Sequence, residues 1–487
     1  MAEVLFITPP YNEQFLMPEI GVPQLRAFLG QHGISSHHID LNHEFIHRFL
    51  PDRHHGWWGA REDTERLLRV KNHDINAFFQ HLEEPNPVYK SFFQSYLIPR
   101  FLEDRPRIIG VSVVDTPQLY PACLLIRHLK QLDPTLVTII GGPWATTAHE
   151  ILPDFVAAMP ELDGCISYAG ERPLLELCQA VAEGSDYASV PNLTWRAPSG
   201  VQSNPLGEPI ALSSIPTPDF TDLSLREYRA SVLTVATQSG CYWGHCVFCH
   251  HNVESPWNSQ ASAGHVVDSL ERLSDLHGIR HFFLADTCTD PRLMRDVAKL
   301  LIERRVEVRW SCMTRVEPGY DREFCRLLAD SGCHTIFFGL ESTSSEVLKR
   351  VRKGISVDVL DTSLTNLHEV GVWVNLFVID IPSFPLQALQ ETLDWVADRK
   401  EKVLHVILQT FVLARSSKVW RNPEAIDFII DSRAARDLEV FNLAYSYANK
   451  AETRPLKPLV DDFYRRFAVP ELEKKRRTNP WVLCGLD

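Results

Sequence analysis

Short apolar runs alternate with amphipathic stretches along the first part of the chain. Five of the runs predict buried strands, because each is short, rich in apolar residues and ended by glycine, proline or polar residues. These strands are expected at 3–10, 36–41, 107–114, 136–142 and 162–170, and helices between them at 21–32, 118–131, 147–158 and 172–183. Such alternation predicts a parallel sheet with right-handed crossovers. We therefore expect an α/β, doubly wound (Rossmann-like) domain over 1–185, interrupted by an aromatic and His-rich helical insertion at 45–104.

Residues 186–230 lose the helical period and are rich in proline, glycine and serine. Two short β-like runs flank Pro198, Ser199 and Gly200, which have the composition of a tight turn. The sequence therefore predicts a linker that contains a hairpin.

The alternation of strands and helices starts again at residue 231. Strands are expected at 231–237, 281–285, 307–313, 334–340, 372–380 and 403–413, with helices at 263–277, 291–305, 321–331, 344–353, 357–370 and 386–399. Six strands with helices between them predict an open, partial (β/α)6 barrel over 231–415, whose chemistry lies at the carboxyl ends of its strands. Residues 416–487 predict a mainly helical C-terminal domain.

Composition narrows the class of protein. The 487 residues are 45% hydrophobic and 23% charged, as in ordinary globular enzymes, and the formal charge of −13 argues against a nucleic-acid partner. No stretch approaches the roughly 20 apolar residues of a membrane span, and the first residues lack the features of a signal peptide. We therefore expect a cytoplasmic protein, away from membranes, whose thiols stay reduced.

Three of the eleven cysteines gather in the stretch "TQSGCYWGHCVFCHHN". The other eight are scattered singly and are expected to be small buried hydrophobes. Cys241, Cys246 and Cys249 have the short spacing that binds zinc or an iron–sulfur cluster. A structural zinc site needs four closed ligands, for which His245 or His250 is a candidate fourth, but no second ligand pair follows. A cubane held by three cysteines instead leaves one iron open to a substrate or cofactor.

The trio, which ends Cys246-Val247-Phe248-Cys249 after the first strand of the predicted half-barrel, resembles the radical S-adenosylmethionine (SAM) superfamily. Its first gap is one residue longer than the usual Cys-x3-Cys-x2-Cys. The segments 282–291, 310–318 and 337–354 also resemble strand segments of cobalamin-type members, and 375–385 does so except that Asp380 and Ser383 replace the usual glycines.

This resemblance implies that the trio holds a [4Fe-4S] cluster whose open iron chelates SAM. It further implies that six residues contact SAM: Phe248, Asp286, Arg315, Glu341, Ser342 and Lys353. Taken singly, each has a simpler explanation, since an isolated carboxylate or guanidinium is more often salt-bridged or solvated. Their order and spacing after the trio give them weight.

Segments of the first domain resemble the cobalamin (vitamin B12)-binding domain that precedes radical SAM barrels, so the resemblance covers about 1–415. It implies that cobalamin lies across the sheet and contacts Ser112, Thr116, Gly141, Gly142, Gly170 and Glu171. Glycine suits such a place because its backbone can approach a bulky ligand, although a glycine pair is also an ordinary strand-to-helix turn. The Asp-x-His-x-x-Gly signature of other cobalamin proteins is absent, as it is from many radical SAM members.

The resemblance as a whole implies a cobalamin-dependent radical SAM C-methyltransferase of the class B type. A radical derived from SAM would abstract hydrogen from an unactivated carbon of a small-molecule or peptide substrate, and methylcobalamin would deliver the methyl group. A flavodoxin or ferredoxin would supply electrons. Two alternatives remain open: a non-methylating cyclisation or rearrangement with a repurposed or vestigial cobalamin domain, and a zinc-bearing binding module without catalysis.

Overall fold

The chain divides into two compact units between Tyr228 and Arg229, each with its own parallel sheet. The computed structural model describes residues 3–10, 17–45, 78, 82, 87–114, 116–228, 230–249, 251, 257–411, 413, 417–430 and 456–472. His250, most of the insertion expected at 45–104 and most of the region after 430 lie outside these described residues.

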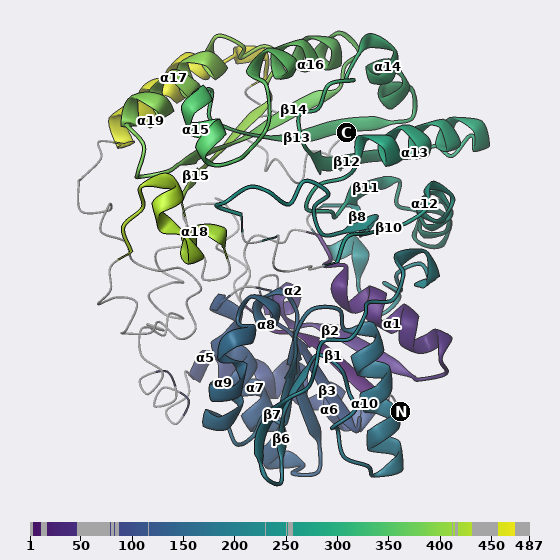
Figure 1. Cartoon of the computed structure of the whole chain (residues 1–487). Helices are drawn as coiled ribbons and strands as arrows, with labels where there is room; N and C mark the ends of the chain where they lie inside the picture. Colours follow the sequence, from purple (N-terminus) through teal and green to yellow (C-terminus); the bar gives the residue numbers. More distant parts are fainter. Residues whose placement is uncertain are drawn as a thin grey trace. The chain divides into compact units, whose positions relative to one another are not determined.

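The first unit contains a seven-stranded sheet with the order β2-β1-β3-β4-β5-β6-β7 (Figure 1). The strands are β1 Val4–Thr8, β2 Ser36–Asp40, β3 Ile108–Ser112, β4 Val137–Gly141, β5 Gly164–Ile166, β6 Leu193–Ala197 and β7 Gly200–Ser203. The first five are parallel, as predicted. Their order is the flavodoxin-like 2-1-3-4-5, which places the topological switch point between β1 and β3, where ligands of such sheets bind.

The hairpin expected in the linker is formed by β6 and β7, and it extends this sheet. Strand β6 pairs antiparallel with β5, with Trp195 opposite Gly164. Glycine is required at that place because a Cβ on Gly164 would lie 2.7 Å from the carbonyl oxygen of Thr194. The side chains of Leu193 and Trp195 are buried in a core cluster of the first unit. This segment is therefore integral to the first sheet rather than a free connection.

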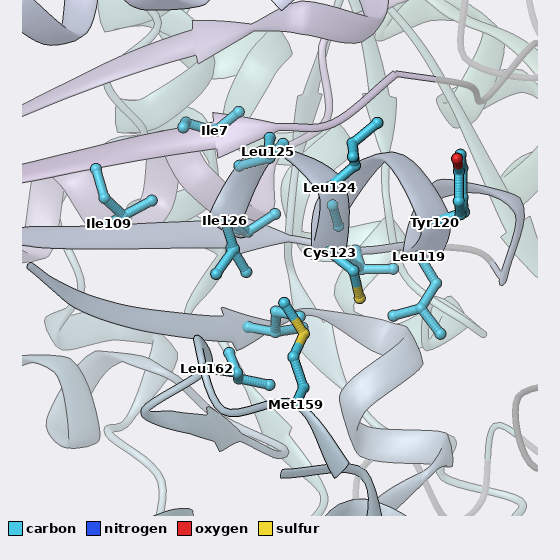
Figure 2. Packing of buried hydrophobic residues seen from close by; sticks show 14 of the residues in the cluster. Ile7, Ile109, Leu119, Tyr120, Cys123, Leu124, Leu125, Ile126, Met159 and Leu162 are labelled. Atoms are coloured by element: carbon cyan, nitrogen blue, oxygen red, sulfur yellow. The ribbon is translucent and has the colours of Figure 1, made fainter. Parts of the chain in front are cut away.

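Helices cover both faces of the first sheet, as the alternating pattern predicted. They are α1 Gly21–Gln31, α2 Leu41–Glu44, α5 Pro87–Phe92, α6 Ile98–Asp104, α7 Leu119–Leu132, α8 Pro143–Thr147, α9 Leu152–Ala158 and α10 Glu171–Glu183. Figure 2 shows Cys123 and Ile126 of α7 packed near Ile109 of β3, with Met159 and Leu162 beyond them. The helix expected at 147–158 is divided into α8, a 3-10 turn and α9.

The second unit contains a six-stranded, fully parallel sheet with the order β15-β14-β13-β12-β11-β8 (Figure 1). Its strands are β8 Val232–Val235, β11 His281–Leu284, β12 Arg309–Thr314, β13 Cys333–Glu341, β14 Trp373–Asp380 and β15 His405–Thr410. Among the described residues β8 and β15 are edge strands, so the barrel is open, as predicted.

The expected helices of the second unit all form within a few residues of their predicted bounds. They are α12 Ala263–His277, α13 Pro291–Arg304, α14 Arg322–Asp330, α15 Ser345–Arg350, α16 Val357–Glu369 and α17 Leu386–Ala397. Strand alternation places Phe283, Phe337 and Phe377 together, with consecutive ring centroids 6.1 Å apart. These rings form an aromatic layer across the middle of the sheet.

Two helices after the barrel lie in the second unit: α18 Lys418–Arg421 and α19 Leu456–Phe467. Helix α19 packs on α17, where Arg466 pairs with Asp394 at 2.5 Å. Within the described part of the chain, no helix combines the length and apolar character that a membrane span requires.

Candidate active site

The cysteine trio lies on the loop that follows β8, at the carboxyl edge of the open barrel. A short strand, β9 Gln238–Ser239, begins this loop and pairs antiparallel with β10 Ser259–Gln260. Cys241, Cys246 and Cys249 are partly exposed and form no disulfide. The trio therefore occupies the edge where parallel barrels carry their chemistry.

Trp243, within the first cysteine gap, anchors the loop to the turn after α15. Its Nε1 donates a hydrogen bond to the carbonyl oxygen of Arg352 at 3.0 Å. Its ring lies against Gly354, which has a φ of +65° and whose absent Cβ would overlap the indole. The Arg315 guanidinium stacks 3.9 Å from the Trp243 ring centroid and donates to the carbonyl oxygens of Lys353 and Gly354 at 2.7 and 3.1 Å.

A second set of bonds ties the loop to α18 and to the end of α15. The Val247 N–H donates to the carbonyl oxygen of Val351, and the Val419 N–H donates to that of Val247, both at 3.0 Å. Lys418 Nζ donates to the carbonyl oxygen of Gly244 at 2.6 Å. Gly244 has a φ of +60°, so a left-handed turn accommodates the longer first cysteine gap. Contacts with the surrounding protein thus fix the loop backbone.

The three thiols differ in acidity. A hydrogen bond from Cys288, helped by loop N–H groups, lowers the pKa of Cys241 to about 5 against the opposing effect of burial. Burial raises the pKa of Cys249 to about 12 and that of Cys246 above its ordinary value, while Lys353 opposes both shifts. Cys241 is therefore a thiolate at neutral pH, and metal binding must displace protons from the other two.

Cys288 is a fourth cysteine in this site that the sequence reasoning placed among the scattered ones. It follows β11, is buried, and lies near Cys241 and Tyr242. The Tyr242 hydroxyl also lies 3.4 Å from Glu317 Oε1. The signal in the sequence was its place just past the strand that pairs with β8, since carboxyl ends of neighbouring parallel strands meet.

The donor set fits an iron–sulfur cluster. Within the described ranges, no three His, Cys, Asp or Glu side chains converge closely enough to hold one metal ion. A cubane sets a different demand, because each cysteine binds a different iron and the sulfurs need only surround the cluster. Three thiols on one anchored loop, none in a disulfide, meet that demand, and the cations of Lys353 and Arg315 act on Cys246 to favour its thiolate.

Glu341 and Lys353 form a buried ion pair beside the trio. Lys353 Nζ lies 2.7 Å from Glu341 Oε1, whereas Glu341 Oε2 is buried without a hydrogen-bond partner. Glu341 also has a φ of +62°, where the β13–β14 register shifts. Gly339 leaves room for the pair, because a Cβ there would lie 2.6 Å from Glu341 Oε1. Left-handed backbone and an unpaired buried oxygen at one residue point to a ligand.

Lys353 stays charged at this place. Burial lowers the pKa of its ammonium group, but the charges of Glu341 and Cys246 outweigh that effect and hold the pKa above its ordinary value. The Lys353 Nζ also lies 6.0 Å from the ring centroid of Phe248, between the last two cysteines. The structure therefore gathers Phe248, Glu341 and Lys353 beside the trio.

Asp286 has a different role from the SAM contact that the resemblance implied. Its carboxylate accepts the N–H groups of Thr237 and Gln238 at 2.7 and 2.8 Å, and the hydroxyls of Thr237 and Thr289. These four bonds use the acceptor positions of both oxygens, so none is left for the SAM amino group. Asp286 instead joins the ends of β8 and β11 and so positions the start of the cysteine loop.

Arg315 and Ser342 are likewise engaged within the protein. The Arg315 guanidinium stacks on Trp243, and its Nε donates a hydrogen bond to Glu317 Oε1 at 2.9 Å. The Ser342 hydroxyl accepts the Ser344 N–H at 3.1 Å and lies 3.3 Å from the Thr392 hydroxyl. Direct SAM contacts by these two residues remain predictions.

The glycine pair expected to contact cobalamin lies at the end of β4, one strand away from the switch point. Gly142 has a φ of +97°, and a Cβ there would lie 2.6 Å from the carbonyl oxygen of Val113. Packing against the end of β3 therefore explains this glycine without a ligand. A Cβ on Gly141 would meet only the carbonyl oxygen of Ile166, at 3.6 Å. Packing within the fold therefore does not require glycine at this position.

The remaining cobalamin candidates have mixed surroundings. Gly170 and Glu171 begin α10 and contact α1: a Cβ on Gly170 would lie 3.2 Å from Leu25, and Glu171 Oε1 accepts from Gln24 at 2.7 Å. These contacts are helix packing. Ser112 ends β3, and the nearby Thr116 starts a 3-10 turn at the same edge of the sheet. Their roles toward a ligand remain predictions.

Gln118 and Trp144 were not singled out from the sequence, although Gln118 lies at the switch-point edge and Trp144 follows β4. The fully buried Gln118 accepts from the Val114 N–H and donates to the carbonyl oxygen of Pro9, both at 2.9 Å, so it joins the loops after β3 and β1. The indole N–H of Trp144 is buried without a hydrogen-bond partner. Its ring packs against Phe155 in the core of the first unit, with the ring centroids 5.2 Å apart.

Residues 235–396 match the family model of the Radical SAM superfamily. The uncharacterized methyltransferase PH0819 of Pyrococcus horikoshii is 27% identical over 305 residues, 59% of this chain and 63% of that protein. The anaerobic magnesium-protoporphyrin IX monomethyl ester cyclase of Rubrivivax gelatinosus is 26% identical over 322 residues, 60% of this chain and 55% of the cyclase. The matched region therefore spans less than two thirds of either relative.

A solved structure also shares the fold. The cobalamin-dependent SAM radical enzyme OxsB, with aqua-cobalamin and SAM bound, aligns with a TM-score of 0.71 over 97% of this chain and 70% of that chain, at 17% identity. At that identity the likeness establishes architecture alone. These matches show that residues 235–396, which carry the anchored cysteine trio, form a radical SAM domain, and that the chain shares the fold of OxsB.

Proposed function

We propose that this protein is a cobalamin-dependent radical SAM C-methyltransferase that acts on an unactivated carbon of a small-molecule or peptide substrate. The observation that carries the proposal is that Glu341 lies beside the cysteine trio. Three thiols that form no disulfide lie on one fixed loop, and beside them Glu341 presents an unpaired, buried carboxylate oxygen. An iron–sulfur cluster and SAM need these two features together.

When bound, the cluster supplies one electron for SAM cleavage, and cobalamin supplies a methyl group. The protein holds and orients these groups. Cys241, Cys246 and Cys249 would ligate the cluster, while Glu341 Oε2 would accept a hydrogen bond from a hydroxyl or ammonium group of SAM. Phe248 would pack beside the adenine. Lys353 holds Glu341 in place through the ion pair.

The first unit supports the cobalamin half of the proposal. Its parallel strands have the 2-1-3-4-5 order with a switch point between β1 and β3. Gly141 leaves space at the end of β4, which pairs with β3. OxsB, whose fold this chain shares, holds aqua-cobalamin in its solved structure.

Loss of one cluster ligand tests whether the two cofactor sites are separate. After anaerobic reconstitution with iron, sulfide and cobalamin, Cys246→Ala should abolish SAM cleavage and retain most of the cobalamin of the wild-type protein. Cys325→Ala is the matched control, because Cys325 is a buried cysteine of α14 outside the trio. Equal loss of SAM cleavage and cobalamin in Cys246→Ala would contradict two independent sites.

A non-methylating reaction is the second candidate. One relative is a cyclase by name, and PH0819 is a methyltransferase by name. The ratio of methylated product to 5′-deoxyadenosine separates the two outcomes. Methyl transfer predicts product methylated in step with 5′-deoxyadenosine, whereas cyclisation predicts 5′-deoxyadenosine without methylated product. A flavodoxin or ferredoxin is the electron donor that we propose for either reaction.

A further inference from the structure

Tyr168 follows the carboxyl end of β5 in a backbone conformation that disfavours its own side chain. Its φ is +61°, in the left-handed region. That region is unfavourable for any residue with a Cβ and unusual for a bulky one, whereas glycine adopts it freely. Glycine would therefore suit this turn between β5 and α10 better, and the tyrosine ring calls for another explanation.

Hydrogen bonds on both sides hold Tyr168 in this conformation. The Tyr168 N–H donates to the hydroxyl of the buried Thr146 at 2.8 Å. The Ser167 N–H donates to the carbonyl oxygen of Asn192 at 3.1 Å, and Asn192 Nδ2 donates to that of Ala169 at 3.0 Å. A strained residue persists only where its surroundings fix it in this way, and such residues cluster at ligand sites.

The ring of Tyr168 packs beside the ring of His149, and the two form an aromatic pair. Their ring centroids are 5.7 Å apart, with an angle of 49° between the ring planes. His149 begins the 3-10 turn after α8, and its Nδ1 donates to the Thr146 carbonyl oxygen at 3.1 Å. Thr146 therefore holds both members of the pair. Both are half-buried, so each keeps part of its surface accessible.

The aromatic pair follows the carboxyl ends of two parallel strands. Tyr168 comes after β5, and His149 comes after β4 and α8. Ligands of such sheets bind outside the carboxyl ends of the strands. Cobalamin has one aromatic group, the dimethylbenzimidazole base of its nucleotide tail, whereas methyl and amide groups surround its corrin ring. Because aromatic rings favour offset or edge-to-face packing on another aromatic ring, the base is the part of cobalamin that suits this pair.

We propose that Tyr168, supported by His149, is a cobalamin-binding residue whose ring packs on the dimethylbenzimidazole base. In this proposal the chain bears the left-handed backbone at Tyr168 for the sake of that contact. The inference rests on the cobalamin part of the proposed function and does not depend on methyl transfer.

Paired measurements of cobalamin binding and stability test the proposal. Wild type, Tyr168→Gly, Tyr168→Phe and the control Arg105→Gly would be prepared as the whole chain. Equilibrium dialysis would give the dissociation constants of cyanocobalamin and of dicyanocobinamide, which lacks the base, and thermal midpoints would be measured without either ligand. Arg105 is the matched control, because it is an exposed residue with a φ of +47° just before the amino end of β3, at the opposite edge of the same sheet.

We expect Tyr168→Gly to bind cyanocobalamin about threefold to tenfold more weakly than wild type, which is the range that an aromatic contact contributes. Its affinity for dicyanocobinamide should be unchanged. Tyr168→Phe keeps the ring, so it should bind both corrinoids as wild type does, and so should Arg105→Gly. The thermal midpoint of Tyr168→Gly should not fall below that of wild type, because relief of the backbone strain offsets the lost ring contacts.

Unchanged cyanocobalamin affinity in Tyr168→Gly would overturn the inference. An equal loss of affinity for cyanocobalamin and dicyanocobinamide would also overturn it, since the ring would then contact the corrin. A thermal midpoint of Tyr168→Gly well below that of wild type would show that the ring serves packing instead. A wild-type protein that binds neither corrinoid would contradict the proposed function itself.

Discussion

Lys353 Nζ lies 2.7 Å from Glu341 Oε1 at the carboxyl end of β13, and both side chains are buried. The pair leaves Glu341 Oε2 unpaired, on a residue whose backbone is left-handed. A buried carboxylate with one oxygen committed and one open is costly unless a ligand completes it. This relationship separates Glu341 from Asp286, whose acceptors are all used by the protein.

Glu341→Gln should weaken SAM binding at least about tenfold, because a charge-assisted hydrogen bond contributes about 1.5–3 kcal/mol. Equilibrium binding of SAM to the reconstituted protein measures this. The substitution also leaves Lys353 buried without its partner, so the thermal midpoint should fall. Glu346→Gln, an exposed glutamate in the first turn of α15, is the matched control. SAM affinity unchanged by Glu341→Gln would exclude Glu341 from the SAM site.

Gly354→Ala should impair cluster uptake through Trp243 rather than through the general fold. The new Cβ would collide with the indole and displace the loop that carries the trio. Gly278→Ala is the control, because Gly278 has a φ of +68° and nothing within 4 Å of its absent Cβ. Both variants bear the left-handed backbone cost of about 1–2 kcal/mol. Only Gly354→Ala should lose iron after reconstitution. Equal iron contents would show that the anchor does not set the loop.

Alkylation of the metal-free protein should distinguish the cysteines by pH. The pKa of Cys241 is lowered to about 5, so its reactive thiolate predominates above that pH and declines about tenfold for each unit below it. The pKa of Cys249 is raised to about 12, so Cys249 stays protonated at neutral pH. Iodoacetamide at pH 7, with peptide mass spectrometry, should label Cys241 well ahead of Cys249. Preferential labelling of Cys249 would refute the order of acidity.

Substitutions at two adjacent glycines of the first unit test packing and ligand binding separately. Gly142→Ala should destabilise the protein by about 1–3 kcal/mol, because it needs a left-handed backbone and would meet the Val113 carbonyl oxygen. Gly141→Ala has space and should change stability by less than about 0.5 kcal/mol. If cobalamin lies over this edge, Gly141→Ala should reduce cobalamin retention while the thermal midpoint holds. Full retention in Gly141→Ala would place cobalamin elsewhere.

The alternating pattern predicted most of the fold because strands and helices differ in their hydrophobic period. Gly184 illustrates the strength of local signals: it ends α10 with a left-handed φ of +68°, as expected of glycine after a helix. The attachment of β6 to β5 was not predictable in this way. An isolated hairpin and an added pair of edge strands have the same local pattern, and only the long-range pairing of Trp195 with Gly164 distinguishes them.

The site shows the same division between local and long-range information. The cysteine trio could be recognised from the sequence because its members lie within nine consecutive positions. The place of Cys288 in the site could not, because it depends on which strand lies beside β8. Asp286 shows the converse limit. Its position after a strand suggested a ligand contact, but its acceptors are satisfied by Thr237, Gln238 and Thr289, which a sequence pattern does not reveal. A sequence pattern shows which residue stands at a position, but it does not show which groups hydrogen-bond to that residue.

EPR spectroscopy of the anaerobically reconstituted, reduced protein, recorded with and without SAM, tests most directly whether one iron is open. A four-iron signal that changes shape when SAM is added, and that is lost in Cys246→Ala, is the predicted result. A zinc-bearing, colourless protein, or a four-iron signal that SAM leaves unchanged, would contradict it.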